Sequence, residues 1–217
     1  MSKLILFTSG STTEPKEVTH SWEYMKYYIN NSISEMNLVS SDIVLNVFPS
    51  NTIAYHTITA GPAIEVGATL ISIIFDPYNY IKVFNKYRPT VISLIPRHYE
   101  ILKNTKNWKS LDMSCVRYMV TGSSPFSQEM IDDLLDHGVK VVSNWYGMTE
   151  MPPPVFVGNN SIKFDFTSKD GYFIEFSDDG ECIINGFYTG DIFDVKNRIF
   201  LYRKNNATNI TWKNNFN

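Results

Sequence analysis

Short runs of apolar residues alternate with amphipathic segments along most of the chain. The runs are rich in β-branched and aromatic residues, as strands are, whereas the segments between them repeat apolar residues at helical spacing. Strands are predicted at residues 4–7, 43–48, 68–74, 90–95, 116–121 and 139–143, and helices at 21–36, 63–65, 80–87, 97–104 and 127–138. Repeated alternation builds βαβ units, so we expect an α/β fold, with a largely parallel sheet and helices on both faces.

The pattern changes after the prolines at 152–154, where the helical periodicity stops. Short strands are predicted at residues 172–176, 181–185, 192–195 and 199–202, separated by Asp-Gly and Asn-Gly turns that favour hairpins. The sequence therefore predicts a small antiparallel β unit near the C-terminus, packed on the main domain.

Charge and composition exclude several classes of protein. The 217 residues carry a net charge of −3 without a block of like charges, which argues against a nucleic-acid partner. Cys115 and Cys182 form no CxxC pair and fit no zinc spacing. The N-terminal apolar run is too short for a signal peptide, and no stretch reaches the length of a membrane span. We expect a cytoplasmic protein without a membrane partner.

A hydroxyl-rich segment, Thr8 to Lys16, directly follows the first predicted strand. Its hydroxyls and backbone N–H groups could donate to phosphate oxygens, and Lys16 adds a positive charge. The spacing is not that of a Walker A loop, because no second glycine precedes the lysine. From these residues alone, a phosphate-binding loop and an ordinary solvated connection both remain open.

Five segments, in order along the chain, resemble motifs of the adenylate-forming superfamily, which contains acyl-CoA synthetases, peptide-synthetase adenylation domains and luciferases. The segment at 7–16 resembles its phosphate loop, and residues 62–70 resemble the helix and strand behind its acyl pocket. Residues 121–125 resemble its adenine-contacting turn, 144–150 its Tyr-Gly-x-Thr-Glu motif, and 188–191 its ribose-binding Tyr-Thr-Gly-Asp motif.

The resemblance implies a role for each matched residue. Tyr146 would stack on adenine, Asp191 would bind the ribose, and Arg203, at the family's hinge arginine, would reach the ribose or the α-phosphate. Lys16, Thr149 and Glu150 would act in catalysis, and Glu150 would also hold Mg²⁺. The implied ATP- or AMP-binding residues are Thr8, Ser9, Gly10, Ser11, Thr12, Thr13, Lys16, Gly122, Ser123, Ser124, Pro125, Asn144, Tyr146, Gly147, Thr149, Asp191 and Arg203.

Structural alternatives stay open for these residues. Tyr146 could be packing with Glu150 solvated, Asp191 could cap a turn, and Arg203 could lie on the surface. Residues 122–125 could form a plain β-turn. His20 and His56 are interpreted as structural, His20 as a surface or capping residue and His56 within a pocket wall at 51–56.

The sequence departs from the family pattern in two respects. Thr13 and Glu17 stand where the family has glycine, and Glu17 adds a negative charge near a polyphosphate, so we expect weaker ATP binding. The family's C-terminal domain, with its catalytic lysine, has no counterpart in these residues, so we expect slow adenylation unless a partner supplies it.

Two functions follow from the resemblance. The first is a minimal adenylate-forming enzyme that uses Mg-ATP to activate a small carboxylic acid. Its further partner could be coenzyme A, a carrier protein or a complementing protein chain, and the sequence leaves this choice open. The second is a non-catalytic ATP/AMP-binding module. In both, residues 1–154 are the nucleotide-binding core, 155–204 complete the nucleotide site, and 205–217 form a flexible tail.

Overall fold

A six-stranded sheet forms the centre of the computed structural model, which describes residues 3–8, 16–167 and 169–204. Its strand order is β4-β3-β5-β6-β7-β8. The first five of these strands are parallel, and β8 pairs antiparallel to β7. The strands are β3 (Ile43–Asn46), β4 (Thr69–Ser72), β5 (Val91–Ser93), β6 (Tyr118–Gly122), β7 (Val142–Tyr146) and β8 (Phe156–Asn159).

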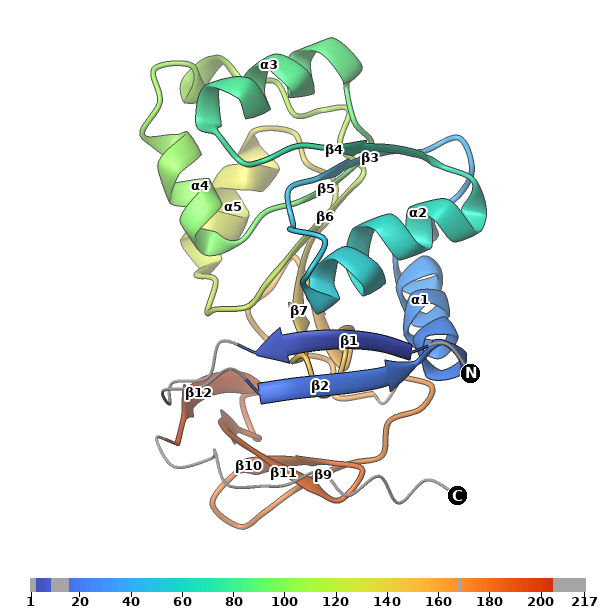
Figure 1. Ribbon diagram of the computed structural model, residues 1–217. Helices are drawn as coiled ribbons and strands as arrows, with labels where there is room; N and C mark the ends of the chain where they lie inside the picture. Colours follow the sequence, from blue (N-terminus) through green and yellow to red (C-terminus); the bar gives the residue numbers. More distant parts are fainter. Residues whose placement is uncertain (1–2, 9–15, 168, 205–217) are drawn as a thin grey trace.

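Helices cover both faces of this sheet, as Figure 1 shows. One face packs against α1 (Trp22–Met36) and α2 (Ala60–Val66), and the other against α3 (Pro77–Tyr87), α4 (Pro96–Lys103) and α5 (Gln128–Asp136). Val44 and Val91 point to the first face, whereas their neighbours Leu45 and Ile92 point to the second. This alternation is the period-2 pattern of a strand buried on both sides. The predicted α/β fold is confirmed.

A separate four-stranded antiparallel sheet lies near the C-terminus, in the order β12-β11-β10-β9. Its strands are β9 (Ile174–Phe176), β10 (Glu181–Ile184), β11 (Phe187–Asp194) and β12 (Ile199–Arg203). An aromatic cluster joins it to the large sheet, since Tyr146 and Phe156 pack with Phe193. The predicted β unit is confirmed. The division at residue 154 remains a prediction, and β8, which follows it, belongs to the large sheet.

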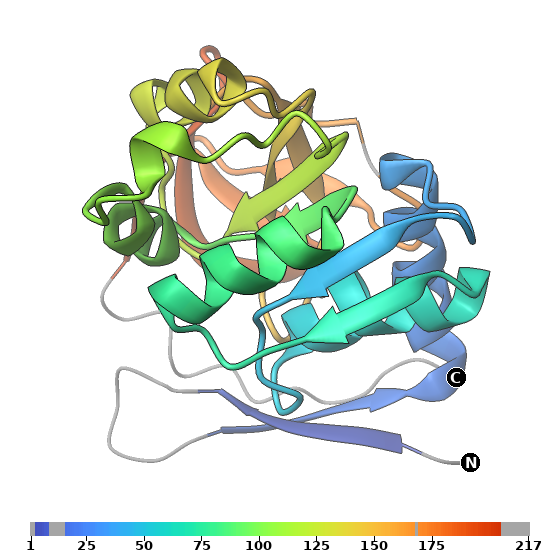
Figure 2. The same cartoon turned by 90° about the horizontal axis from the view of Figure 1, so that it is seen from above.

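A hairpin of β1 (Lys3–Thr8) and β2 (Lys16–Ser21) forms a third sheet. Figure 2 shows it along one side of the molecule. The sequence pattern does not predict β2, because Lys16–Ser21 is mostly polar and follows a loop-like segment. The strand forms because Leu6 of its partner strand packs on Met25 and Ile53, which anchors the hairpin to the body.

Local signals explain where the helices begin and end. The Ser21 side chain accepts from the N–H of Tyr24, and that of Ser127 accepts from the N–H of Met130, as N-caps do. α2 continues from a π-helical turn, η1 (Tyr55–Thr59), and a 3₁₀ turn, η2 (Trp108–Ser110), follows α4. Among the described residues, none of the helices is long and apolar enough to cross a membrane.

Candidate functional site

A buried carboxylate links the two larger sheets at the carboxyl end of β7. Asp191 of β11 is 1% exposed and pairs across the strands with Arg203 of β12. Arg203 donates from Nε to Oδ1 at 2.6 Å and from a terminal nitrogen to Oδ2 at 2.7 Å. The Tyr146 hydroxyl, from the last residue of β7, donates to Oδ2 at 2.7 Å. These three donors satisfy the charge that burial of Asp191 would otherwise leave uncompensated.

The ring of Tyr146 belongs to the aromatic cluster between the sheets. It is 9% exposed, stacks on Phe156 with 5.3 Å between ring centroids, and meets the edge of Phe193. Burial, and then the negative charge of Asp191, raise the pKa of Tyr146 well above its usual value. Tyr146 therefore keeps its proton at physiological pH and donates a hydrogen bond to Asp191. Its predicted stacking on adenine remains a prediction.

The predicted adenine turn follows β6, beside β7. A Cβ on Gly122 would lie 2.5 Å from the carbonyl oxygen of Trp145, so only glycine fits this close approach. Ser123 adopts φ +69°, the left-handed conformation that favours glycine, which gives a physical reason for the family's second glycine here. Residues 123–125 are exposed. Buried just before them, the Thr121 hydroxyl has no hydrogen-bond partner among the described residues.

The next turn, after β7, carries the predicted phosphate and metal residues. Gly147 packs so closely on Pro153 that a Cβ would lie 2.7 Å from the proline nitrogen. The N–H of Met148 donates to the carbonyl of Met151 at 2.8 Å, which closes residues 148–151 into a turn. Thr149 and Glu150 are partly buried within it. Asn144 is buried two residues before Tyr146, on the same face of β7.

His20 connects the β1–β2 hairpin to this turn. Its Nε2 lies 2.7 Å from the carbonyl oxygen of Thr149, and the side chain is 8% exposed. Burial lowers the pKa of His20, against smaller opposing effects of this hydrogen bond and of the Glu150 charge. The interpretation of His20 as a surface or capping residue is wrong, because the side chain is buried and hydrogen-bonded to Thr149. The sequence pattern does not predict this contact, since 129 residues separate the two.

A cavity of about 660 Å³ opens between the hairpin, α1 and the 148–151 turn. Glu150, His20 and Glu17 line it, together with the rings of Tyr24, Tyr27 and Tyr28. The structure thus brings Glu150 and β2 to one hollow. Glu17, where the family has glycine, lies in the same hollow.

The predicted phosphate loop is bounded by two described residues. Thr8, the last residue of β1, pairs with Lys16, the first residue of β2, so the ends of the loop are neighbours in one ladder. Ser9, Gly10, Ser11, Thr12 and Thr13 lie outside the described residues, and their predicted roles remain predictions.

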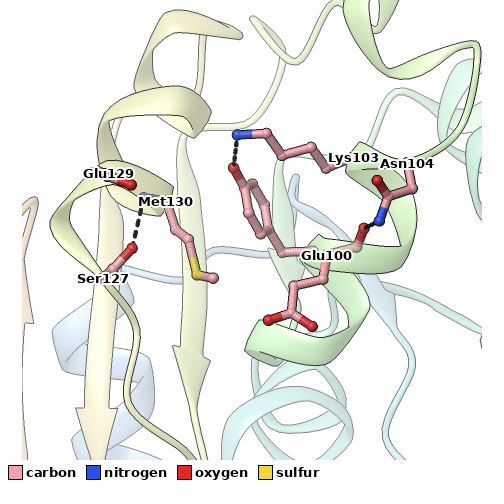
Figure 3. Close-up of a pocket in the computed structure, with 7 residues that line it drawn as sticks. Glu100, Lys103, Asn104, Ser127, Glu129 and Met130 are labelled. Carbon is pink, nitrogen blue, oxygen red and sulfur yellow. Dashed lines mark hydrogen bonds between the residues drawn. The ribbon is translucent and has the colours of Figure 1, made fainter.

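A second, smaller cavity of about 250 Å³ lies between α4 and the start of α5 and holds none of the predicted site residues. Figure 3 shows Glu100 and Lys103 of α4, and Asn104 just after it, across from Ser127, Glu129 and Met130. A tyrosine also binds a carboxylate here: the Tyr99 hydroxyl donates to Asp133 at 2.6 Å and accepts from Lys103 at 2.9 Å. Asp133 is 26% exposed, so this group is far more hydrated than the one around Asp191.

The α/β fold, with its glycine-dependent turns at the strand ends, is shared with a known family of proteins. A family model described as AMP-binding enzyme matches residues 3–171. The chain belongs to this family.

Among its curated relatives is a feruloyl-CoA synthase of an Amycolatopsis species, 29% identical over 71% of this chain and 31% of the relative. Another is an indoleacetate–CoA ligase of Aromatoleum aromaticum, 30% identical over 69% of this chain and 29% of the relative. The chain spans about a third of the length of these relatives.

Solved structures share the fold. The inhibitor-bound N-terminal domain of FACL13 from Mycobacterium tuberculosis matches with a TM-score of 0.79 and 22% identity, over 92% of this chain and 59% of that one. The O-succinylbenzoate coenzyme A synthetase of Bacillus subtilis, in complex with ATP and magnesium ion, matches with a TM-score of 0.77 and 18% identity, over 92% and 49%.

Proposed function

We propose that this chain binds Mg-ATP and activates a carboxylic acid as an acyl-adenylate. A carboxylate oxygen attacks the α-phosphorus, the bond from that phosphorus to the bridging oxygen of the β-phosphate breaks, and pyrophosphate leaves. The observation that carries the proposal is the Asp191 group. In this group a buried carboxylate, an arginine and a tyrosine lie together between the two sheets, at the carboxyl end of β7. Ligands of α/β folds bind at the carboxyl ends of the strands.

The chemistry of Asp191 suits a ribose. A carboxylate offers about four lone-pair positions, and Arg203 and Tyr146 occupy three of them in the described contacts. One position on Oδ1 is left, but Asp191 is 1% exposed, so a ribose hydroxyl would have to displace Arg203 to reach the carboxylate. Such a displacement would free the guanidinium to approach the α-phosphate.

Mg²⁺ is usually held by one or two carboxylates together with substrate phosphates and waters. Among the described residues, no three His, Cys, Asp or Glu side chains converge as a metal cage. Glu150 lies on the wall of the large cavity, which suits binding of Mg²⁺ by one carboxylate together with substrate phosphates and waters. When bound, the ion would supply positive charge to the departing pyrophosphate, and Lys16 would add to it from the start of β2.

A second function is favoured by one observation, the presence of Glu17 in the same cavity as Glu150. The two carboxylates outnumber Lys3 on the wall of this cavity, and their excess negative charge repels the β- and γ-phosphates of ATP more than it repels AMP. A module that binds AMP or an acyl-adenylate without turnover would tolerate this arrangement.

Calorimetric titration with Mg-ATP and with AMP, beside pyrophosphate exchange dependent on a carboxylic acid, separates the two functions. The names of the relatives suggest ferulate, 4-coumarate and indoleacetate as first acids. Exchange supports the enzyme, and binding without exchange for any acid in a broad panel supports the module. Asp191→Asn is expected to weaken ATP and AMP alike, because both carry the ribose. If that variant binds both nucleotides as wild type does, neither function stands.

A further inference from the structure

The hydrogen bond between His20 and Thr149 joins β2 to the 148–151 turn. The proposed function assigns residues of both segments to the phosphates and Mg²⁺. β2 begins with Lys16 and leads from the predicted phosphate loop, and the 148–151 turn carries Thr149 and Glu150. The carbonyl of Thr149 can only accept, so His20 donates from Nε2 over 2.7 Å. This contact therefore couples the position of the loop-bearing strand to that of the turn.

The geometry of β2 transmits this coupling toward Lys16. Residues 16, 18 and 20 lie on one face of the strand, because successive side chains alternate. Residues 17 and 19 share the opposite face, where Thr19 donates to Glu17. Fixing His20 against the turn thus fixes the rotation of the strand, and with it the face that carries Lys16.

The turn is also held from its other end. Tyr172 donates its hydroxyl to the carbonyl of Pro152. Tyr28 of α1 stacks on Tyr172 at 5.6 Å, and its ring also meets the His20 ring at 83° and 6.1 Å. His20, Tyr28 and Tyr172 form one packed row between the hairpin and the two ends of the 149–152 segment. A packed row of this kind holds the turn in one place rather than letting it slide along the hairpin.

We propose that His20 is a positioning residue, which sets the distance between β2, the strand that begins with Lys16, and the Thr149–Glu150 turn through its Nε2–H···O bond to Thr149. The inference rests on the proposed function and deepens it. It assigns to His20 the part of nucleotide binding that depends on the β- and γ-phosphates and Mg²⁺, and assigns to Asp191 the part that depends on the ribose.

Two amide variants form a matched test. The side-chain amide of His20→Gln reaches the position of Nε2 and can still donate to Thr149, whereas that of His20→Asn falls short, near the position of Nδ1. Mg-ATP and AMP affinities are measured for wild type and both variants. We expect His20→Asn to bind Mg-ATP about five- to tenfold more weakly, as for one lost hydrogen bond, and AMP within twofold of wild type. His20→Gln should stay within about threefold of wild type for both.

The outcomes separate this inference from the proposed function. Equal weakening of Mg-ATP and AMP by His20→Asn, no weakening, or a Gln variant that behaves like the Asn variant overturns the inference and leaves the proposed function standing. If His20→Asn fails to fold while His20→Gln folds, the bond serves the whole fold and the inference is wrong. Wild-type protein that binds neither nucleotide overturns both proposals.

Hydrogen exchange without nucleotide gives an independent check. Amides at 148–151 should exchange faster in His20→Asn than in His20→Gln, while those of β6 stay unchanged, because local opening follows the loss of local contacts. Equal exchange at 148–151 in the two variants overturns the inference.

Discussion

Removing the Tyr146 hydroxyl with Tyr146→Phe tests how strongly the buried Asp191 depends on its neighbours. The ring stays packed on Phe156 and Phe193, so the change removes one hydrogen bond of 2.7 Å and little else. Hydrogen bonds to a charged group contribute about 1.5–3 kcal/mol to stability. Asp191 is 1% exposed and water cannot readily replace the lost donor, so we expect about 2–3 kcal/mol less free energy of unfolding.

Urea denaturation at pH 7 measures this loss. With a slope of about 2–3 kcal/mol/M for a chain of this size, the midpoint should fall by about 1 M with the slope unchanged. Tyr99→Phe is the matched control, since it also removes a tyrosine-to-aspartate bond, of 2.6 Å, together with the bond that this hydroxyl accepts from the exposed Lys103. Its acceptor Asp133 is 26% exposed and can turn to water, so about 0.5–1 kcal/mol is expected. A Tyr146→Phe loss no larger than the control's would refute the claim that burial makes Asp191 dependent on Tyr146.

Three further predictions concern other parts of the fold. Ser123→Gly should raise the free energy of unfolding by about 1 kcal/mol, because it relieves φ +69°, and a thermal or urea midpoint that falls would contradict this. Arg117→Met should cost about 3–5 kcal/mol, because Asp42, 4% exposed, would lose both of its bonds to the guanidinium; an unchanged urea midpoint would show that Asp42 needs no partner. Burial lowers the pKa of His98, which stacks on Phe75, to about 4. Because the folded pKa lies below the usual 6.5, the stability this ring contributes is present above pH 6.5 and lost as the pH falls toward 4. The full shift corresponds to about 3.4 kcal/mol, and partial exposure of the ring reduces the expected loss to about 1–2 kcal/mol. His98→Phe should lose that much less between pH 7 and pH 4 in parallel urea titrations, and equal losses would contradict the assignment to His98.

Local signals account for the parts of the fold that the sequence predicts correctly. Alternating strands and helices indicate a sheet covered on both faces, and Ser21 and Ser127 mark helix starts that the structure confirms. These signals succeed because an N-cap depends on a neighbour three residues away. The last parallel strand is shifted, with residues 139–143 predicted and Val142–Tyr146 observed, because the strand continues into the motif at Asn144–Tyr146. Where a strand ends depends on its pairing with neighbouring strands, and local propensity carries no information about that pairing.

The resemblance in sequence selects the residues of the candidate site, but it does not describe their contacts. Asp191 and Tyr146 are 45 residues apart, and only the packing of the two sheets turns one into the hydrogen-bond partner of the other. The strand Lys16–Ser21 and the burial of His20 were not predictable, because both arise from contacts with Thr149 and with the hairpin partner.

The sequence by itself determined the α/β architecture, the order of the motifs and the family, because each of these is written in short local patterns. The tertiary structure decided which charges are buried, which donors satisfy them, and that the hairpin and the Thr149–Glu150 turn share one cavity. The physical reason is that burial and hydrogen bonding depend on distances between segments far apart in the chain, and only the folded packing sets those distances.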